Sequence, residues 1–211
     1  MDSIFDIFKI GIGPSSSHTV GPMKAAKDFI ESLDIDLINK VNKINIELYG
    51  SLAFTGAGHN IQNGLILGLL GYTPDNINSD RIKEAQLAIT NKYLNINTNK
   101  KIFFDSKKDI IFKTNKTIVN EANRMKFSGY NSSDKIISSE YVSIGGGFIV
   151  KKGEKIKVNN KYKFPYSFSS CDELLGICDN NNLAIHELVL KNEETICSQD
   201  QVYKKILKIW D

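Results

Sequence analysis

Long apolar runs, a leader-like N-terminus and a strong excess of either charge are all missing from this chain of 211 residues. No apolar stretch approaches the ~20 residues that a helix needs to cross a bilayer, and the first residues lack the charged and apolar regions of a signal peptide. The formal net charge is only +3, and the lysines are scattered rather than gathered into one patch. These absences predict a cytoplasmic protein whose partners are neither a membrane nor a nucleic acid.

Cysteine is scarce, and its spacing does not resemble that of a metal centre. The three cysteines are Cys171, Cys178 and Cys197, and no C-x-x-C motif is present, whereas iron–sulfur clusters usually take thiolates at short, characteristic spacings. We interpret them as small, partly buried thiols in a reducing compartment and assign no metal site to this chain. Neither a G-x-G-x-x-G motif nor a Walker sequence is present, which argues against a doubly wound nucleotide-binding fold.

The most informative segment that is present is Gly11–Pro22, which reads G-I-G-P-S-S-S-H-T-V-G-P. It holds four hydroxyls and one imidazole, those of Ser15, Ser16, Ser17, Thr19 and His18. An amphipathic helix follows, so backbone N–H groups and the positive end of a helix dipole meet these side chains. Such a loop can hold a small anion, for example a carboxylate, beside a proton-transfer group. The simpler alternative is that Ser17 or Thr19 only caps the helix, but capping needs one hydroxyl and four are present.

A second helix start follows the predicted strand Lys43–Tyr49, whose apolar and polar residues alternate. The glycine-rich turn Gly50–His59 leads into a predicted helix, Ile61–Leu70, so that His59 lies beside the helix start. Taken alone, His59 is more often a structural or capping residue than a catalytic one.

Three consecutive glycines, Gly145, Gly146 and Gly147, interrupt a long strand predicted from Lys135 to Lys151. Glycine weakens a strand unless a bulge or the close approach of a ligand requires it. Either a β-bulge or a contact between bare backbone N–H groups and a substrate carboxylate explains the run.

The remaining pattern predicts an α+β fold, with one mixed or antiparallel sheet, helices packed on it and a C-terminal helical extension. Further strands are expected at Lys101–Phe104, Asp109–Lys113 and Lys126–Tyr130. Ser170 begins a capping box for a helix that runs to about Cys178, and two more helices follow, around 185–192 and from about Ser198, with His186 interpreted as a surface residue. The last helix ends the chain with an apolar face and no terminator, so we expect the chain to be truncated there.

The segment Ser3–Ala26 resembles the start of the bacterial iron–sulfur L-serine dehydratases, or L-serine ammonia-lyases. Three later segments follow in the order of that family: Tyr49–His59, Tyr141–Ile149, and Phe164–Tyr166 with the helix after it. The resemblance implies that residues 1–165 form the β domain, which is similar to the substrate-binding regulatory domain of some phosphoglycerate dehydrogenases. Residues 166–211 would then begin the helical α domain of family members that are about twice as long.

The activity implied by this resemblance is deamination of L-serine to pyruvate and ammonia, a β-elimination assisted by a [4Fe–4S] cluster. The cluster ligands would belong to the missing α domain, so this chain alone is expected to be inactive. Its expected partners are that α domain and a second copy in a homodimer. The resemblance places His59 at the active site; His18 and His59 are the candidates for proton transfer. The carboxylate and amino groups of the substrate would be bound by Ser15, Ser16, Ser17, Thr19 and the backbone of Gly145, Gly146 and Gly147.

Two departures from the family pattern leave other functions open. Ile61 and Gln62 stand where the family has a Thr-Asp pair, so we expect Gln62 or Asn63 to replace the missing carboxylate as the partner of His59. Arg124 stands where the family often has glycine in a turn, and it would be strained if that position required a positive φ. The alternatives are a stand-alone regulatory module that binds a small amino acid or carboxylate without catalysis, and a pseudoenzyme.

Overall fold

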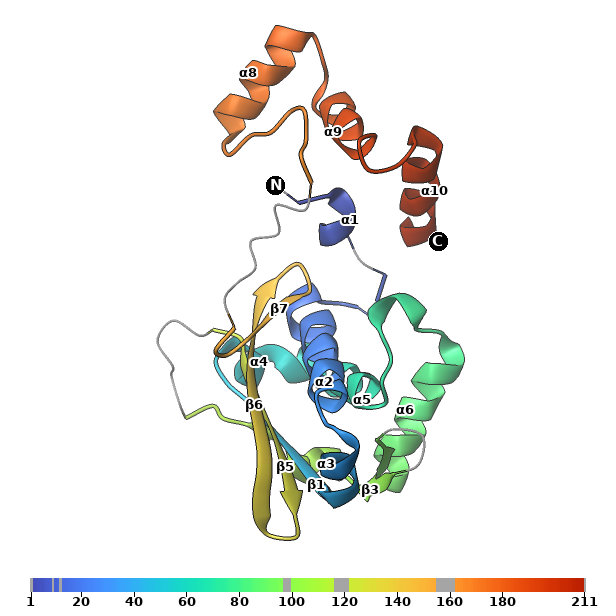
Figure 1. The fold of residues 1–211 in the computed structure, drawn as a ribbon, viewed down its shortest axis with the longest axis vertical. Helices are drawn as coiled ribbons and strands as arrows, with labels where there is room; N and C mark the ends of the chain where they lie inside the picture. Colours follow the sequence, from blue (N-terminus) through green and yellow to red (C-terminus); the bar gives the residue numbers. More distant parts are fainter. Residues whose placement is uncertain are drawn as a thin grey trace. The chain divides into compact units, whose positions relative to one another are not determined.

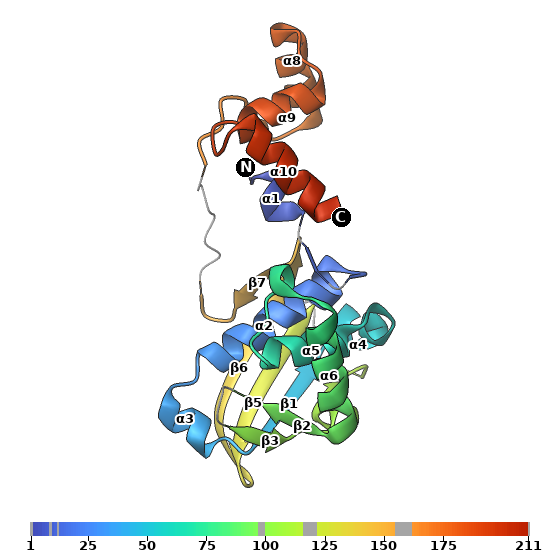
Figure 2. The same ribbon diagram turned by 90° about the vertical axis from the view of Figure 1, so that its right-hand side faces the viewer.

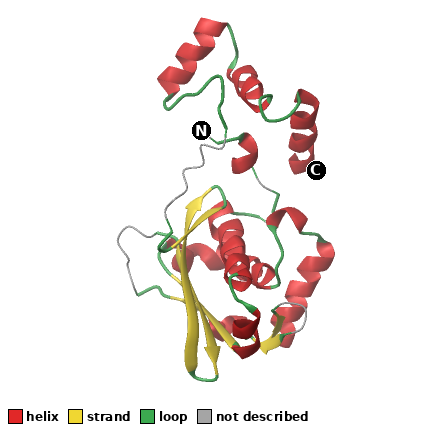
Figure 3. Ribbon diagram, in the orientation of Figure 1, coloured by secondary structure: helices red, strands yellow, loops and turns green. Residues whose placement is uncertain are grey.

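The protein is represented by a computed structural model that describes residues 2–8, 10–11, 13–96, 100–115, 122–154 and 162–210. The chain divides into two compact units, Ile10–Ile156 and a second one made of Met1–Lys9 with Lys157–Asp211. The larger unit contains the β-sheet and the smaller one is helical (Figures 1 and 3).

A five-stranded mixed sheet forms the centre of the larger unit. Its strands, in the order in which they lie side by side, are β4 (Ile110–Phe112), β1 (Lys43–Leu48), β5 (Arg124–Asn131), β6 (Asp134–Gly145) and β7 (Phe148–Lys151). The β1–β4 pair is parallel and the other three pairs are antiparallel. The predicted α+β class and the mixed sheet are thereby confirmed.

One face of this sheet carries the core, and two helices cover it (Figure 2). Ile46 of β1 pairs in register with Phe127 of β5, and both are fully buried. Helix α2 (Gly21–Glu31) places Phe29 on Phe127, with the two ring centroids 5.4 Å apart. The apolar positions predicted for this helix from its 3.6-residue periodicity are all buried.

Helix α5 (Ile61–Leu69) packs against α2 at unusually close range because it presents glycine at the contact. A Cβ built on Gly68 would lie 2.1 Å from the carbonyl oxygen of Met23, and one built on Gly64 would lie 2.8 Å from that of Thr19. The two backbones therefore meet with no side chain between them, which fixes the position of the α5 start relative to the α2 start.

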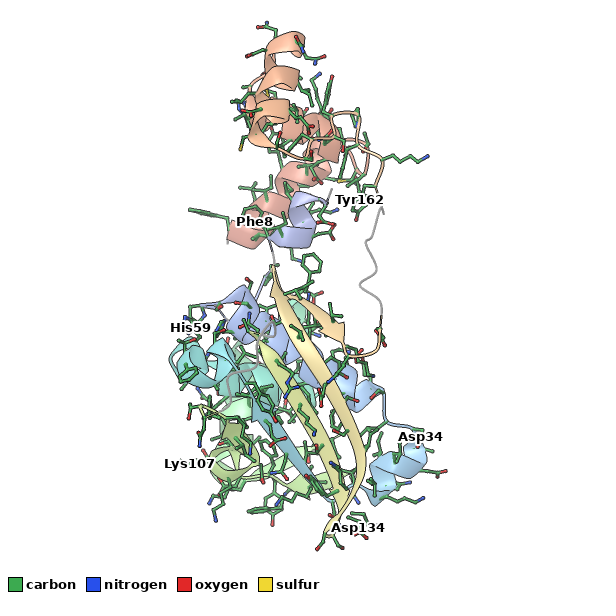
Figure 4. The ribbon with its side chains drawn as sticks, turned by 90° about the vertical axis from the view of Figure 1, so that its left-hand side faces the viewer. Phe8, Asp34, His59, Lys107, Asp134 and Tyr162 are labelled. Atoms are coloured by element: carbon green, nitrogen blue, oxygen red, sulfur yellow. The ribbon has the colours of Figure 1, made fainter. Side chains whose placement is uncertain are left out.

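The opposite face of the sheet, which faces the viewer in Figure 4, is polar. Glu47 and Lys126 are directly paired in the β1–β5 register and alternate with the buried residues of their strands. Glu47 forms an ion pair with Lys113 at 3.0 Å. Alternation of this kind is what a sheet with one solvated face requires.

The other elements of the larger unit are short and surround the sheet. They are η1 (Ser16–Val20), α3 (Ile35–Lys40), α4 (Ser51–Thr55), η2 (Gly56–His59), η3 (Pro74–Asn76), α6 (Ser79–Asn91), α7 (Ser106–Asp109) and the two-stranded sheet of β2 (Tyr93–Asn95) and β3 (Lys101–Phe103). Strand β2 was not predicted from the sequence.

The prediction of one long strand from Lys135 to Lys151 is wrong. Residues 146 and 147 form a two-residue turn, and the chain returns as β7 alongside β6. Gly145, Gly146 and Gly147 have φ values of 94°, 57° and 71°, a region that favours glycine, so the run reverses the chain instead of extending it. The register of β6 and β7 also shifts between Ser143 and Gly145, at the entry to this turn.

The smaller unit consists of four helices: α1 (Ile4–Ile7), α8 (Cys171–Asn181), α9 (Ile185–Glu193) and α10 (Gln199–Trp210). Ser170 caps α8 as predicted, and the helix runs on to Asn181. The full capping box is not formed, because the Glu173 carboxylate accepts from the Ser169 N–H at 2.7 Å and not from that of Ser170. The buried carboxylate of Glu193 accepts hydrogen bonds from the Ser3 hydroxyl at 2.7 Å and from the Ile4 N–H at 2.9 Å, which holds α1 against α9.

The predicted surface position of His186 is confirmed. The three cysteines are free: Cys171 is exposed, Cys178 is buried and Cys197 is intermediate. Across the described parts of the chain, every helix is too short or too polar to traverse a lipid bilayer.

Candidate functional site

The two histidines singled out in the sequence lie next to each other in the larger unit. The ring centroids of His18 and His59 are 5.0 Å apart, and the ring planes are tilted by 44°. His59 lies at the opposite end of the sheet unit from the hairpin at Asp134 (Figure 4). Segments η1 and η2, which carry the two rings, are thus brought together by the packing of α2 on α5.

His18 is held by the serines of its own turn. The Ser15 hydroxyl accepts a hydrogen bond from the His18 backbone N–H at 3.1 Å and caps η1, a π-helical turn that continues directly into α2. Neither Ser17 nor Thr19 is the cap, because the helical conformation begins earlier than expected, at Ser16. The Ser17 hydroxyl instead lies 2.9 Å from His18 Nδ1.

His59 is oriented by a backbone carbonyl. Its Nδ1 lies 2.8 Å from the carbonyl oxygen of Thr55, the last residue of α4. A carbonyl oxygen can only accept, so Nδ1 carries the proton and Nε2 of the neutral ring is left with its lone pair.

The expectation that Gln62 or Asn63 supports His59 is wrong. The Asn63 amide donates to the Asn60 side chain at 2.7 Å, and Asn60, with φ 58°, turns the chain between η2 and α5. The turn separates the imidazole from the α5 side chains, and the ring lies back over α4.

Burial and the neighbouring His59 lower the pKa of His18 below its ordinary value, while the backbone of Ser51 opposes this shift. The neutral ring is therefore favoured near pH 7. His18 Nε2 is buried, and among the described residues no hydrogen-bond partner for it is found. An unpartnered buried nitrogen is energetically costly, and a ligand or a water molecule that met it would relieve that cost.

The glycine turn is joined to the same region through the start of α2. The Lys24 ammonium donates to the Gly147 carbonyl at 2.8 Å. A Cβ built on Gly147 would lie 2.8 Å from Cγ1 of Val20, two residues beyond His18. The turn therefore lies directly against the end of η1.

Two polar residues near the site were missed in the sequence. The Ser51 hydroxyl donates to the Asn123 side-chain oxygen, and the Asn123 amide donates to the Ser143 carbonyl at 3.2 Å. This chain of bonds connects the start of α4, below His18, to the end of β6. Their positions at strand ends, with Ser51 after β1 and Asn123 before β5, could have indicated in the sequence that they lie near the site.

Arg124 shows no backbone strain, because it lies in the extended strand β5 and not in the left-handed region. Its guanidinium lies over the Tyr49 ring, 4.2 Å from the centroid, and pairs with Glu140 at 3.4 Å. Arg124 therefore replaces the glycine of the family pattern without a positive φ and without strain.

Residues 3–154 match the sequence profile of a family described as Serine dehydratase beta chain. The chain is 38% identical to L-serine dehydratase TdcG of Escherichia coli (strain K12) over 213 residues, which cover 100% of this chain and 47% of that protein. It is 36% identical to the L-serine dehydratase of Haemophilus influenzae, again over 100% of this chain and 47% of the relative. A Streptomyces coelicolor L-serine dehydratase is 34% identical over 99% of this chain and 47% of its own length. The chain thus spans about half the length of the curated relatives it matches.

Proposed function

Because the chain belongs to the serine dehydratase beta-chain family, we propose that it forms part of an enzyme that deaminates L-serine to pyruvate and ammonia. The observation that carries the proposal is the pair of imidazoles, His18 and His59, with ring centroids 5.0 Å apart. One ring has a lowered pKa and the other a fixed tautomer.

The reaction requires removal of the α-proton of serine and loss of its β-hydroxyl with a second proton. The immediate product, 2-aminoacrylate, tautomerises to an imine that water hydrolyses to pyruvate and ammonia. We assign the proton transfers to His18 and His59 as a pair. The neutral His18 ring suits acceptance of a proton near pH 7, and His59 Nε2 keeps a lone pair because its Nδ1 proton is held by Thr55.

The substrate carboxylate and amino group would be bound by the η1 serines and by backbone N–H groups of the glycine turn. Ser16 is the exposed member of the three serines, and its hydroxyl is the one most open to a ligand. Ser15 and Ser17 each make a hydrogen bond to His18 and retain capacity for a further one. Gly145, Gly146 and Gly147 lack Cβ atoms, so a carboxylate can approach their backbone closely.

The residues of this chain do not fit the ligand set of an iron–sulfur cluster. No group of three or more potential metal ligands is found within the described residues. The cysteines differ in burial, and the Cys197 sulfur accepts from Lys205 at 3.7 Å. We place the proposed [4Fe–4S] cluster in the remainder of the protein that corresponds to the other half of the relatives. This chain alone is then inactive.

The same proposal extends to organisation. In this proposal residues 1–165 correspond to the β domain, similar to the regulatory domain of phosphoglycerate dehydrogenase, and 166–211 lead into the α domain. The compact sheet unit itself is Ile10–Ile156, and residues 1–9 and 157–165 belong to the helical unit. The whole protein acts as a homodimer in the cytoplasm. The free thiols support a reducing compartment.

The test is pyruvate formation from L-serine by a protein that joins this chain to the cluster-bearing half, reconstituted anaerobically. H18A and H59A should each lower kcat by about 100-fold or more, in the range of a lost proton-transfer group. H186A is the matched control, because His186 is exposed and lies in the smaller unit. Full turnover in both H18A and H59A would overturn the assignment.

A regulatory module without catalysis is the second candidate, since the anion-binding loop is contained in this chain alone. Calorimetry of L-serine with the 211-residue chain separates the two. If L-serine binds to the chain but the joined protein shows no turnover, the result would support a regulatory module. It would also fit a pseudoenzyme, in which Ile61 and Gln62 replace the Thr-Asp pair of the family.

A further inference from the structure

Thr19 connects the two histidine segments. Its side chain is fully buried, and its hydroxyl donates to the carbonyl oxygen of His59 at 2.6 Å, across 40 residues of sequence. Thr19 directly follows His18, so one hydrogen bond joins the backbone beside one imidazole to the backbone of the other.

Thr19 is packed closely against α5. A Cβ built on Gly64 would lie 2.8 Å from the Thr19 carbonyl and 3.3 Å from its methyl carbon. The threonine is therefore pressed against α5, with its methyl group towards the helix and its hydroxyl directed at His59. The hydroxyl is buried and already donates to the His59 carbonyl, so it is not displayed to a substrate.

The bond also supplies a hydrogen-bond donor to the His59 carbonyl group at the end of η2. His59 is the last residue of η2, and the chain turns at Asn60, which has a positive φ. Carbonyl groups at the end of a helical turn lack partners within the helix. The Thr19 hydroxyl supplies one and thereby anchors the end of η2.

We propose that Thr19 is a positioning residue that sets the separation of the His18 and His59 rings, and is not a substrate ligand. Its importance for catalysis rests on the proposed function, whereas its effect on the geometry does not. Ser15 and Ser17 orient His18 within one turn; Thr19 joins that turn to the other histidine.

The test compares T19V, which has nearly the same shape and lacks the hydroxyl, with T19S, which keeps the hydroxyl. Burial lowers the pKa of His18, and the neighbouring His59 lowers it further. By letting the rings move apart, T19V should therefore raise the midpoint of the His18 titration, followed by NMR in the 211-residue chain, above that of the wild type. T19S should retain the wild-type titration. In the joined protein, T19V should lower kcat by roughly 10–100-fold with little change in KM, the effect of misplacing a reacting group by about an ångström.

T90V is the matched control, because the exposed Thr90 hydroxyl also donates to a backbone carbonyl, that of Gln86 at 2.9 Å, far from the site. T90V is the comparison for thermal stability. A T19V chain that loses thermal stability but keeps the wild-type titration of His18 would overturn the proposal, and so would a T19S chain that does not keep it. If T19V does not fold, T19A can replace it, and the same upward shift of the His18 titration is expected. A shifted titration without any serine turnover in the joined protein would refute the function and leave the positioning role intact.

Discussion

The ammonium group of Lys24, one turn into α2, lies 2.8 Å from the carbonyl oxygen of Gly147 in the turn between β6 and β7. This bond ties the glycine turn to the helix that begins beside His18. Replacement by methionine keeps the apolar stem and removes the donor. K24M should weaken L-serine binding about 5- to 10-fold, in line with the loss of a hydrogen bond of about 1 kcal/mol. Calorimetry checks this, with K83M on the exposed surface of α6 as control; unchanged affinity would show that the tie does not matter for binding.

Alanine at position 147 should be harmful for two separable reasons. Gly147 has a φ of 71°, and a Cβ there would lie 2.8 Å from Val20 Cγ1. Gly153 has a φ of 92°, and none of the described residues comes within 4 Å of its built Cβ, so G153A isolates the conformational cost. We expect G153A to lower the free energy of unfolding by about 1–2 kcal/mol and G147A by at least 1 kcal/mol more. Equal losses in urea denaturation would contradict the close docking of the turn.

Alanine should have opposite effects on stability at two helical glycines, Gly68 in the contact between α2 and α5 and Gly176 in α8. In G68A the new methyl group would meet the Met23 carbonyl at 2.1 Å, so the helices must separate, and we expect a loss of at least 2–3 kcal/mol. In the part of the chain that the structure describes, no atom lies within 4 Å of a Cβ built on Gly176 of α8, so G176A should stabilise its helix by about 0.5–1 kcal/mol. Chemical denaturation followed by circular dichroism measures both. A neutral G68A would mean that the two helices pack less closely than described.

The lowered pKa of His18 has a definite consequence for pH dependence. Just below pH 6.5, the ordinary histidine value, the unfolded chain binds a proton that the folded chain does not. The free energy of unfolding therefore falls as the pH is lowered through this range. H18Q should show a shallower decline between pH 7 and 5, measured by urea denaturation at each pH. An identical slope in both proteins would refute the shift.

The same group predicts the acid limb of activity in the joined protein. If neutral His18 accepts the proton, kcat/KM should fall as the pH is lowered, and the midpoint of this fall should lie below pH 6.5. A midpoint above that value would contradict this assignment.

The hydrogen bonds of the Glu193 carboxylate should hold the N-terminal residues on the C-terminal helices. E193A removes the acceptor of the Ser3 and Ile4 bonds, so α1 should detach and the amides of residues 4–8 should exchange faster with solvent. E194A is the control, because Glu194 is the exposed neighbour. Hydrogen exchange measured by mass spectrometry distinguishes them, and equal protection of residues 4–8 in both variants would contradict the role of Glu193.

The local elements were predictable because their signals are local. The alternation in Lys43–Leu48, the periodic face of α2 and the Ser170 cap each depend on residues within one or two turns. The glycine run was misjudged for the same reason. A bulge and a reversal place glycine at similar positions, and only the pairing of β7 with β6 distinguishes them.

The residue types at the site, two imidazoles among hydroxyls at helix starts, were determined by the sequence alone, since hydroxyls, glycines and helix starts declare themselves in short segments. The tertiary structure decided which hydroxyl serves which histidine, and that Thr55 supports His59 in place of Gln62 or Asn63. Of these contacts, the bond between Thr19 and His59 depends on how closely α5 approaches η1 and α2. That approach is set by Gly64 and Gly68 against backbone far away in the chain, a steric relation that no local pattern contains.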